Sequence, residues 1–236
     1  DITFITEPFF QDGVVARAVN QVADHGVAYF TAAGNYGNKS YEGTFLPTVA
    51  PQGIFGVPHD FGGGDIFQHL TLGRGSYTIV LQWEDSIYSL GQLPGALTDL
   101  DIYLVDNDGT VLFGFNRDNI WGDPVEVLSF SVRAPTSANI LITKAWGAQN
   151  VKFKYIIFRG EATIDEHNTA SSTIVGQANA AGAMTVGAAL YLYTPAFGQS
   201  PPTIATFSST GGGLVNGVDR MKPDFVGPNG GNTTVT

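Results

Sequence analysis

The 236-residue chain contains no cysteine, and charged residues make up only 14% of it. Without cysteine it can form neither a disulfide framework nor a metal site built on thiolates. It also lacks a run of about eighteen apolar residues, the length that marks a membrane-spanning helix. These absences exclude disulfide-stapled folds and helical membrane proteins, and no membrane partner is expected.

Basic residues are also scarce. The chain has 11 Lys and Arg against 21 Asp and Glu, a net charge of −10, and the basic residues are scattered along it. Proteins that bind phosphate backbones need a basic face, so no nucleic-acid partner is expected. Hydrophobic residues make up 43%, enough to build a core for one large domain or two modest ones.

The two ends of the sequence lack the usual signals. The chain begins at Asp1 rather than at methionine, and it ends in GGNTTVT without a terminating feature. We therefore expect an excised piece of a longer protein, in which any N-terminal targeting segment has been lost.

Residues 1–58 begin with the pattern of a βαβ unit, the building block of parallel sheets. DITFITEPFF favours a short strand, and VAYFTAA, from residue 27, is typical of a buried strand. Between them, Asp12 and Gly26 are suited to begin and end a helix. The apolar residues of that helix recur at helical spacing and are Val15, Ala18, Val19 and Val22.

Residues 59–160 have a different residue pattern, with strands and no helix. YTIVLQWED, VEVLSFSVRA, ANILITKAW and VKFKYIIFRG are rich in β-branched and aromatic residues, and turn residues separate them. Asn107, Asp108 and Gly109 form a strong hairpin signal between two further strands. The pattern predicts an antiparallel, jelly-roll-like β-sandwich.

Residues 161–236 return to the pattern of residues 1–58, a helix followed by a buried strand. TASSTIVGQANAAG, residues 169–182, has the composition of a small-residue helix, and AMTVGAA follows as a buried strand. The predicted fold class is therefore an α/β parallel-sheet core, residues 1–58 and 161–236, interrupted by an all-β antiparallel sandwich at 59–160.

Four segments carry a resemblance to a known family: GVAYFTAAGNYG, AMTVGAA, ATFSSTGG and KPDFVGPNGGNTTV. In this order they resemble the second half of the subtilisin-like serine peptidases. DLDIYLVDNDGTVL is similar to the β-sandwich modules that accompany secreted bacterial peptidases. The resemblance implies a partial subtilisin-like catalytic core. It also implies a bacterial parent protein, secreted or at the cell surface, that acts on polypeptides without a cofactor.

The resemblance assigns a role to Asn35. In that family the asparagine of the AAGN segment donates a hydrogen bond to the oxyanion, and Ala32, Ala33 and Gly34 would line the substrate pocket. When a serine attacks a peptide carbonyl, the oxygen becomes an anion that a pre-aimed amide stabilises. Asn35 also has a second interpretation, as a turn residue, because asparagine tolerates left-handed backbone.

The sequence departs from the family at the catalytic triad. No HGTH-type histidine with its aspartate and no GTS-type serine is present, and TFITEP lacks the SLG pattern of the strand that pairs with substrate. The resemblance implies that Asp and His precede Asp1 and that the serine follows Thr236. The chain alone is therefore expected to be inactive.

A triad formed within the chain is not expected. His25 is placed at a helix C-terminus, where a cation suits the helix dipole. We expect His59 and His69 to be surface groups beside a glycine-rich segment, and His167 to lie in a solvated acidic turn. Ser208 and Ser209 lie in TFSSTGG without a nucleophile elbow or a local base.

No cofactor is expected, and a bound calcium ion is the alternative. Asp99, Asp101, Asp106 and Asp108 offer carboxylate oxygens, although their spacing is not that of an EF-hand loop. Hairpin chemistry explains the last two without a metal. The three tryptophans, Trp83, Trp121 and Trp146, are interpreted as sandwich core, with a sugar- or peptide-binding groove as the alternative.

Two functional hypotheses remain open. The first is a fragment of a subtilisin-like serine endopeptidase with a polypeptide substrate. The second is a relative without a triad that binds a protein or a glycan through the sandwich. Strand edges exposed by truncation also predict a dimer.

Overall fold

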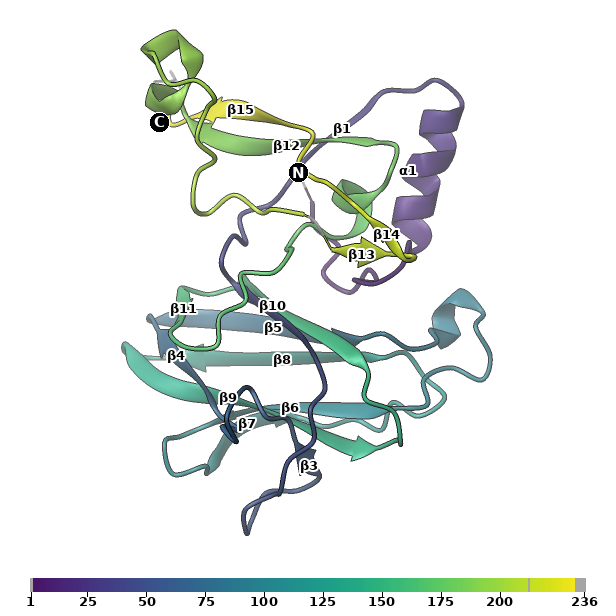
Figure 1. The fold of residues 1–236 in the computed structure, drawn as a ribbon, viewed down its shortest axis with the longest axis vertical. Coiled ribbons are helices and arrows are strands. Elements are labelled where there is room, and N and C mark those ends of the chain that lie inside the picture. Colours follow the sequence, from purple (N-terminus) through teal and green to yellow (C-terminus); the bar gives the residue numbers. More distant parts are fainter. Residues whose placement is uncertain (1, 212, 232–236) are drawn as a thin grey trace. The chain divides into compact units, whose positions relative to one another are not determined.

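The computed structural model describes residues 2–211 and 213–231, and the chain divides into two compact units (Figure 1). The parallel-sheet unit comprises Asp1–Asn38 and Ser171–Thr236, and the sandwich unit comprises Lys39–Ala170. No helix in the described part of the chain is long and apolar enough to cross a membrane.

The parallel-sheet unit is built around β1 (Tyr29–Ala32), β12 (Ala183–Leu190) and β15 (Phe225–Asn229), which pair in parallel in that order. Helix α1 (Val14–Asp24) is the predicted first helix, and it buries Ala16 and Val19 against Ala180 and Ala183. The smaller elements are the 3-10 turns η2 (Gly176–Asn179), η3 (Tyr191–Tyr193) and η4 (Pro195–Phe197), and the β13 (Leu214–Val215) and β14 (Val218–Asp219) hairpin.

The helix predicted at residues 169–182 does not form. Only η2 is helical there, and Gly176 has φ +58°, a left-handed conformation that interrupts an α-helix. Val175, directly before it, is extended, and the amide of Thr173 donates to the carbonyl of Thr210 instead. β-Branched Thr173, Ile174 and Val175 favour this extended backbone.

The sandwich unit consists of two antiparallel sheets, seen as two layers in Figure 1. One sheet has the order β2 (Ser40–Thr44), β10 (Lys152–Arg159), β5 (Gly75–Trp83) and β8 (Val125–Val132). The other has the order β11 (Ala162–Ile164), β4 (Gln68–Leu72), β9 (Thr136–Trp146), β6 (Asp99–Val105) and β7 (Val111–Phe115), with β3 (Val57–Pro58) also pairing with β9. A short 3-10 turn, η1 (Tyr88–Leu90), follows β5.

The main core lies between these two sheets. Its largest fully buried side chains include Trp83, Tyr77, Tyr155, Phe45 and Phe153. These residues come from β5, β10 and the segment after β2, so the core depends on strands that are distant in the chain. The antiparallel strands predicted from β-branched and aromatic patterning are therefore present.

The predicted fold class is nevertheless wrong. The described part of the chain is mostly β, with 39% strand and 11% helix. Within the described residues the only parallel sheet has three strands, and a single α-helix accompanies it. A subtilisin-like α/β core needs more parallel strands and covering helices than this unit contains.

The boundaries between the units also differ from 58/59 and 160/161. They lie at 38/39 and 170/171, because β2 pairs with β10 and β11 pairs with β4. The sequence analysis assigned both segments to the parallel-sheet core. Their backbone hydrogen bonds make them part of the sandwich.

Candidate functional site

A pocket of about 220 Å³ lies in the parallel-sheet unit beside the carboxyl ends of β1 and β15 and the middle of β12. The carboxyl ends of parallel strands meet at one edge of a sheet, which is where α/β proteins usually bind ligands. The lining is made mainly of small residues. It consists of Ala32, Ala33, Gly34, Asn35, Val186, Gly187, Ala188, Ser208, Gly227, Pro228 and Asn229.

Two glycines allow the loop after β1 to approach the loop before β13. Gly34 has φ +97°, and a Cβ added there would lie 2.7 Å from the Tyr36 ring. A Cβ on Gly37 would lie 2.4 Å from the carbonyl oxygen of Thr206. Glycine is thus required at both positions, by backbone conformation at Gly34 and by close backbone approach at Gly37.

Ser208 and Ser209 hold this approach in place. The amide of Ala188 donates to Ser208 Oγ at 3.1 Å, and the amide of Tyr36 donates to Ser209 Oγ at 3.0 Å. The amide of Ser209 donates to the carbonyl of Gly34 at 2.9 Å. Both serines are buried, so their hydroxyls tie the loops to the sheet.

Asn35 lines the pocket and is exposed. Its side-chain amide has no hydrogen-bond partner among the described residues. Asn229, at the end of β15, is also exposed and lines the same pocket. Two amide side chains from different strand ends are therefore available to a ligand in this pocket.

His25, the histidine of this unit, belongs to the opposite edge of the sheet. It follows α1 and precedes β1, whereas the pocket follows β1. Its Nδ1 is hydrogen-bonded to the carbonyl of Gln21 at 2.7 Å. This position fits the structural role expected from the sequence.

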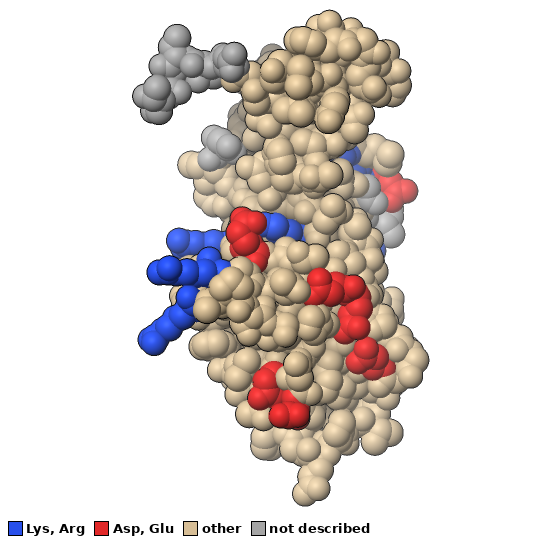
Figure 2. Space-filling model, turned by 90° about the vertical axis from the view of Figure 1, so that its left-hand side faces the viewer, with Lys and Arg blue, Asp and Glu red and all other residues tan. Residues whose placement is uncertain are grey.

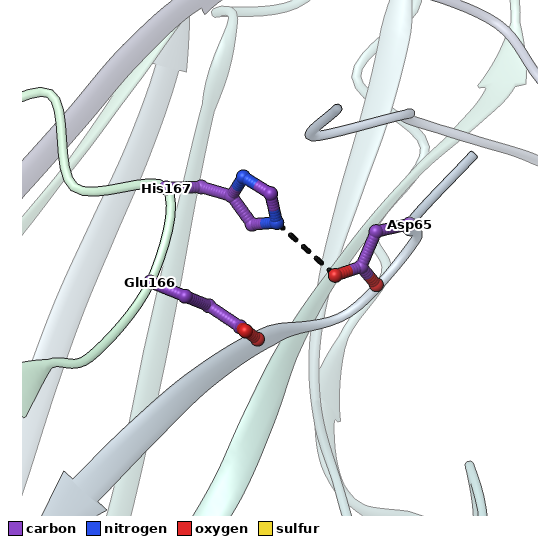
Figure 3. Close-up of side chains that lie close together, drawn as sticks. All are labelled: Asp65, Glu166 and His167. Atoms are coloured by element: carbon purple, nitrogen blue, oxygen red, sulfur yellow. Dashed lines mark hydrogen bonds and ion pairs between the residues drawn. The ribbon is translucent and has the colours of Figure 1, made fainter. Parts of the chain in front are cut away.

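An exposed group of Asp65, Glu166 and His167 occupies the surface of the sandwich unit (Figure 3). His167 Nε2 lies 3.1 Å from Asp65 Oδ2, and the figure shows its ring turned toward that carboxylate. Glu166 Oε1 accepts a hydrogen bond from the amide of His69 at 2.8 Å. These groups fasten a loop to β4, as expected for the acidic turn.

A second acidic group is buried. Asp99 and Asp101 on β6 are each 6% exposed, Glu126 on β8 is 0% exposed, and one carboxylate oxygen from each lies within 4.8 Å of the others. Burial and the neighbouring carboxylates raise the pKa of Glu126 to about 8. Burial, followed by the charge of Asp99, raises the pKa of Asp101 to about 6, and burial also raises the pKa of Asp99.

The prediction that His59 is a surface residue is wrong. His59 is 2% exposed and packs against Phe61 and Phe153 with ring centroids 4.8 Å away in both cases. The amide of Leu46 donates to its Nδ1 at 3.0 Å, so the proton is on Nε2, which lies 3.0 Å from the Tyr41 hydroxyl. Burial lowers the pKa of His59 to about 4.

The prediction that all three tryptophans are buried in the core holds for one of them. Trp83 is a core residue, but Trp121 and Trp146 are 67% and 70% exposed. Trp146 lines a pocket of about 420 Å³ together with Val57, Lys144 and neighbouring residues. Most of the surface in Figure 2 carries neither acidic nor basic side chains, in keeping with the small charged fraction.

Similarity to known proteins is found among solved structures. No protein-family model matches the chain, and no curated protein sequence matches it. Among solved structures the chain is similar to the CspB protease of Clostridium perfringens, with a TM-score of 0.48 and 14% identity. The match covers 93% of this chain and 46% of that protease, so the chain spans less than half of its length.

The structure brings all four residues predicted from the sequence, Ala32, Ala33, Gly34 and Asn35, into the lining of one pocket. The role of Asn35 in catalysis stays a prediction. Sequence reasoning missed Asn229, although a strand followed by an asparagine is the same signal that drew attention to Asn35. It also missed Glu126, whose signal was a charge at a position alternating with the buried Leu128 and Phe130.

Proposed function

We propose that this pocket binds the scissile carbonyl of a polypeptide and that the protein is a serine endopeptidase of the subtilisin-like type. The observation that carries the proposal is the Asn35 amide, which has no partner in the described part of the chain and lines a pocket of small residues. A donor that folding leaves unpaired is available to a charge that develops during reaction. Ala32, Ala33 and Gly34 leave space for a peptide backbone beside it.

The energetic argument concerns the transition state. The carbonyl oxygen gains negative charge only when the nucleophile attacks, so a fixed amide stabilises the transition state more than the substrate. Removal of one such donor lowers kcat by roughly 10²–10³-fold. Asn35 is thus proposed to act on kcat rather than on substrate affinity.

We propose that neither Ser208, Ser209 nor His25 is the nucleophile or the general base, and that both groups lie elsewhere in the parent protein. Ser208 and Ser209 tie loops together, and His25 lies at the far edge of the sheet. A serine nucleophile needs a base within hydrogen-bond reach. The 236-residue chain by itself is therefore proposed to be inactive.

The test uses the full-length parent protein with a fluorophosphonate probe and mass spectrometry to locate the labelled residue. We expect one labelled serine outside residues 1–236 and much slower labelling in Asn35→Ala. Gln199→Ala, which removes an exposed amide outside the pocket in the same unit, is the matched control and should label at the parent's rate. A folded, processed parent that does not label would overturn the proposal.

A second candidate function is glycan binding by the sandwich unit. Trp146, 70% exposed in the lining of its pocket, offers an aromatic face beside the Lys144 side chain. Oligosaccharide binding that Trp146→Ala abolishes, in a parent that does not react with the probe, would favour this function.

A further inference from the structure

The buried acidic group of the sandwich unit contains oxygens that folding does not satisfy. Both carboxylate oxygens of Glu126 are buried, and among the described residues neither has a partner within hydrogen-bond geometry, although the backbone amide of Arg117 favours their charged form. Asp99 accepts one bond, from the amide of Asn119 at 3.3 Å, and Asp101 accepts one, from the Tyr103 hydroxyl at 3.1 Å. A buried polar atom without a partner costs free energy comparable to a lost hydrogen bond, and a buried charge costs more.

The protein offers little positive charge to balance three carboxylates. Arg117 acts favourably on Glu126, but it is a single exposed side chain. The three acids come from both layers, since β6 and β8 belong to different sheets. If all three are ionised, repulsion among them pushes the two sheets apart at this end of the sandwich, and the raised pKa values of Glu126 and Asp101 reflect the cost of that charge.

We propose that Asp99, Asp101 and Glu126 bind a calcium ion that ties β6 to β8. All donors are carboxylate oxygens, which suit a hard divalent cation. Oxygens on opposite sides of Ca²⁺ are about 4.6–5.2 Å apart, because each Ca–O distance is about 2.3–2.6 Å. The observed spacing within 4.8 Å therefore accommodates the ion between them.

A further oxygen is present close by. Asn119, whose amide contacts Asp99, has a buried side-chain Oδ1 without a partner. Calcium takes six to eight oxygen ligands, so the three carboxylates would require additional oxygens of this kind or water. Asp106 is not one of them, because its Oδ1 accepts from the amides of Asp108 and Thr110 in the hairpin turn.

The exposed group of Asp65, Glu166 and His167 provides the contrast. Its members are partly or fully exposed, and Asp65 is already paired with His167. Each group there has a partner or free access to water. An ion is thus proposed only for the buried group, and the exposed group serves as a control.

The test adds Ca²⁺ to the chelator-treated 236-residue chain and follows thermal unfolding and heat of binding. We expect one ion per chain and a rise in Tm of about 5–10 °C at a hundredfold excess over Kd. Terbium should replace calcium with sensitised emission, because the Trp83 indole donates to the carbonyl of Thr98, next to Asp99. Calcium should then displace it.

Two variants remove a ligand while keeping its shape, Glu126→Gln and Asp101→Asn. Each should weaken calcium binding about tenfold or more without lowering the Tm of the calcium-free protein. Glu166→Gln, in the exposed group, should leave binding unchanged. A wild-type chain that neither binds calcium nor gains Tm would overturn the proposal, as would an equal gain in wild type and Glu126→Gln or an equal effect of Mg²⁺.

Discussion

At the scale of single residues, asparagine side chains serve two different purposes in this protein. Asn35 and Asn229 follow strands in the sequence and reach one pocket with their amides available to a ligand. Asn119, by contrast, uses its side-chain NH₂ to bind the carbonyls of Asp123 and Val125 inside the sandwich unit. The residue type indicates hydrogen bonding, but only the surroundings decide whether a ligand can use it.

His59 makes a prediction about acid stability. Its pKa is lowered from 6.5 to about 4 by burial, so the unfolded chain binds a proton more readily than the folded chain between these values. The stabilisation is complete above pH 6.5 and is lost as the pH falls toward 4. The free energy of unfolding should decrease by roughly 3 kcal/mol over this interval on account of His59.

Urea unfolding between pH 7 and pH 4 measures this effect. His59→Asn, which keeps an acceptor for the Leu46 amide, should flatten the dependence, whereas His25→Gln, at an exposed helix end, should not. Equal pH dependence in wild type and His59→Asn would show that another group is responsible.

At the scale of elements, local pattern predicted α1 and failed for residues 169–182. Helix α1 has an apolar stripe that packs on Ala180 and Ala183, and Gly26 with φ +82° follows its end. Residues 169–182 are rich in small side chains, but the amides of Thr173 and Ile174 donate to the carbonyl of Thr210 across the unit. Tertiary hydrogen bonds therefore override a weak helical preference there.

The contact between the loop after β1 and residues 206–209 predicts a strict requirement at Gly37. In Gly37→Ala the new methyl group would meet the carbonyl oxygens of Thr206 and Ser208 at 2.4 and 2.7 Å. Backbone cannot move aside as a flexible side chain does, so we expect a loss of about 1–3 kcal/mol in the free energy of unfolding.

Gly231→Ala is the matched control, because nothing lies within 4 Å of its added methyl group and its φ is not in the left-handed region. Chemical denaturation of both variants measures the difference. A Gly37→Ala protein as stable as Gly231→Ala would mean that the loop can open without cost.

For the whole molecule, the division into two units predicts separate folding. The sandwich unit, Lys39–Ala170, has its own core between two sheets, and its first and last segments belong to it by strand pairing and by a bond from the Glu42 amide to Thr169 Oγ1. A separately expressed 39–170 chain should unfold in one cooperative transition. Circular dichroism during heating measures this.

A 59–160 chain, cut at the boundaries predicted from the sequence, is the control. It lacks β2 and β11, including the buried Tyr41 and Ile164, and should be much less stable or fail to fold. Equal stability of the two pieces would place the boundaries where the sequence suggested.

Patterns of neighbouring residues were enough to predict α1, the antiparallel strands and the small-residue segment ending in Asn35. They depend on interactions within a few positions of the chain, which propensity and periodicity describe. The pairing of β12 with β1 and β15, the meeting of Asn35 with Asn229, and the burial of Glu126 beside Asp99 depend on contacts between distant segments. Such contacts are set by how whole sheets pack, because that packing determines which backbone groups find partners and which side chains lose water.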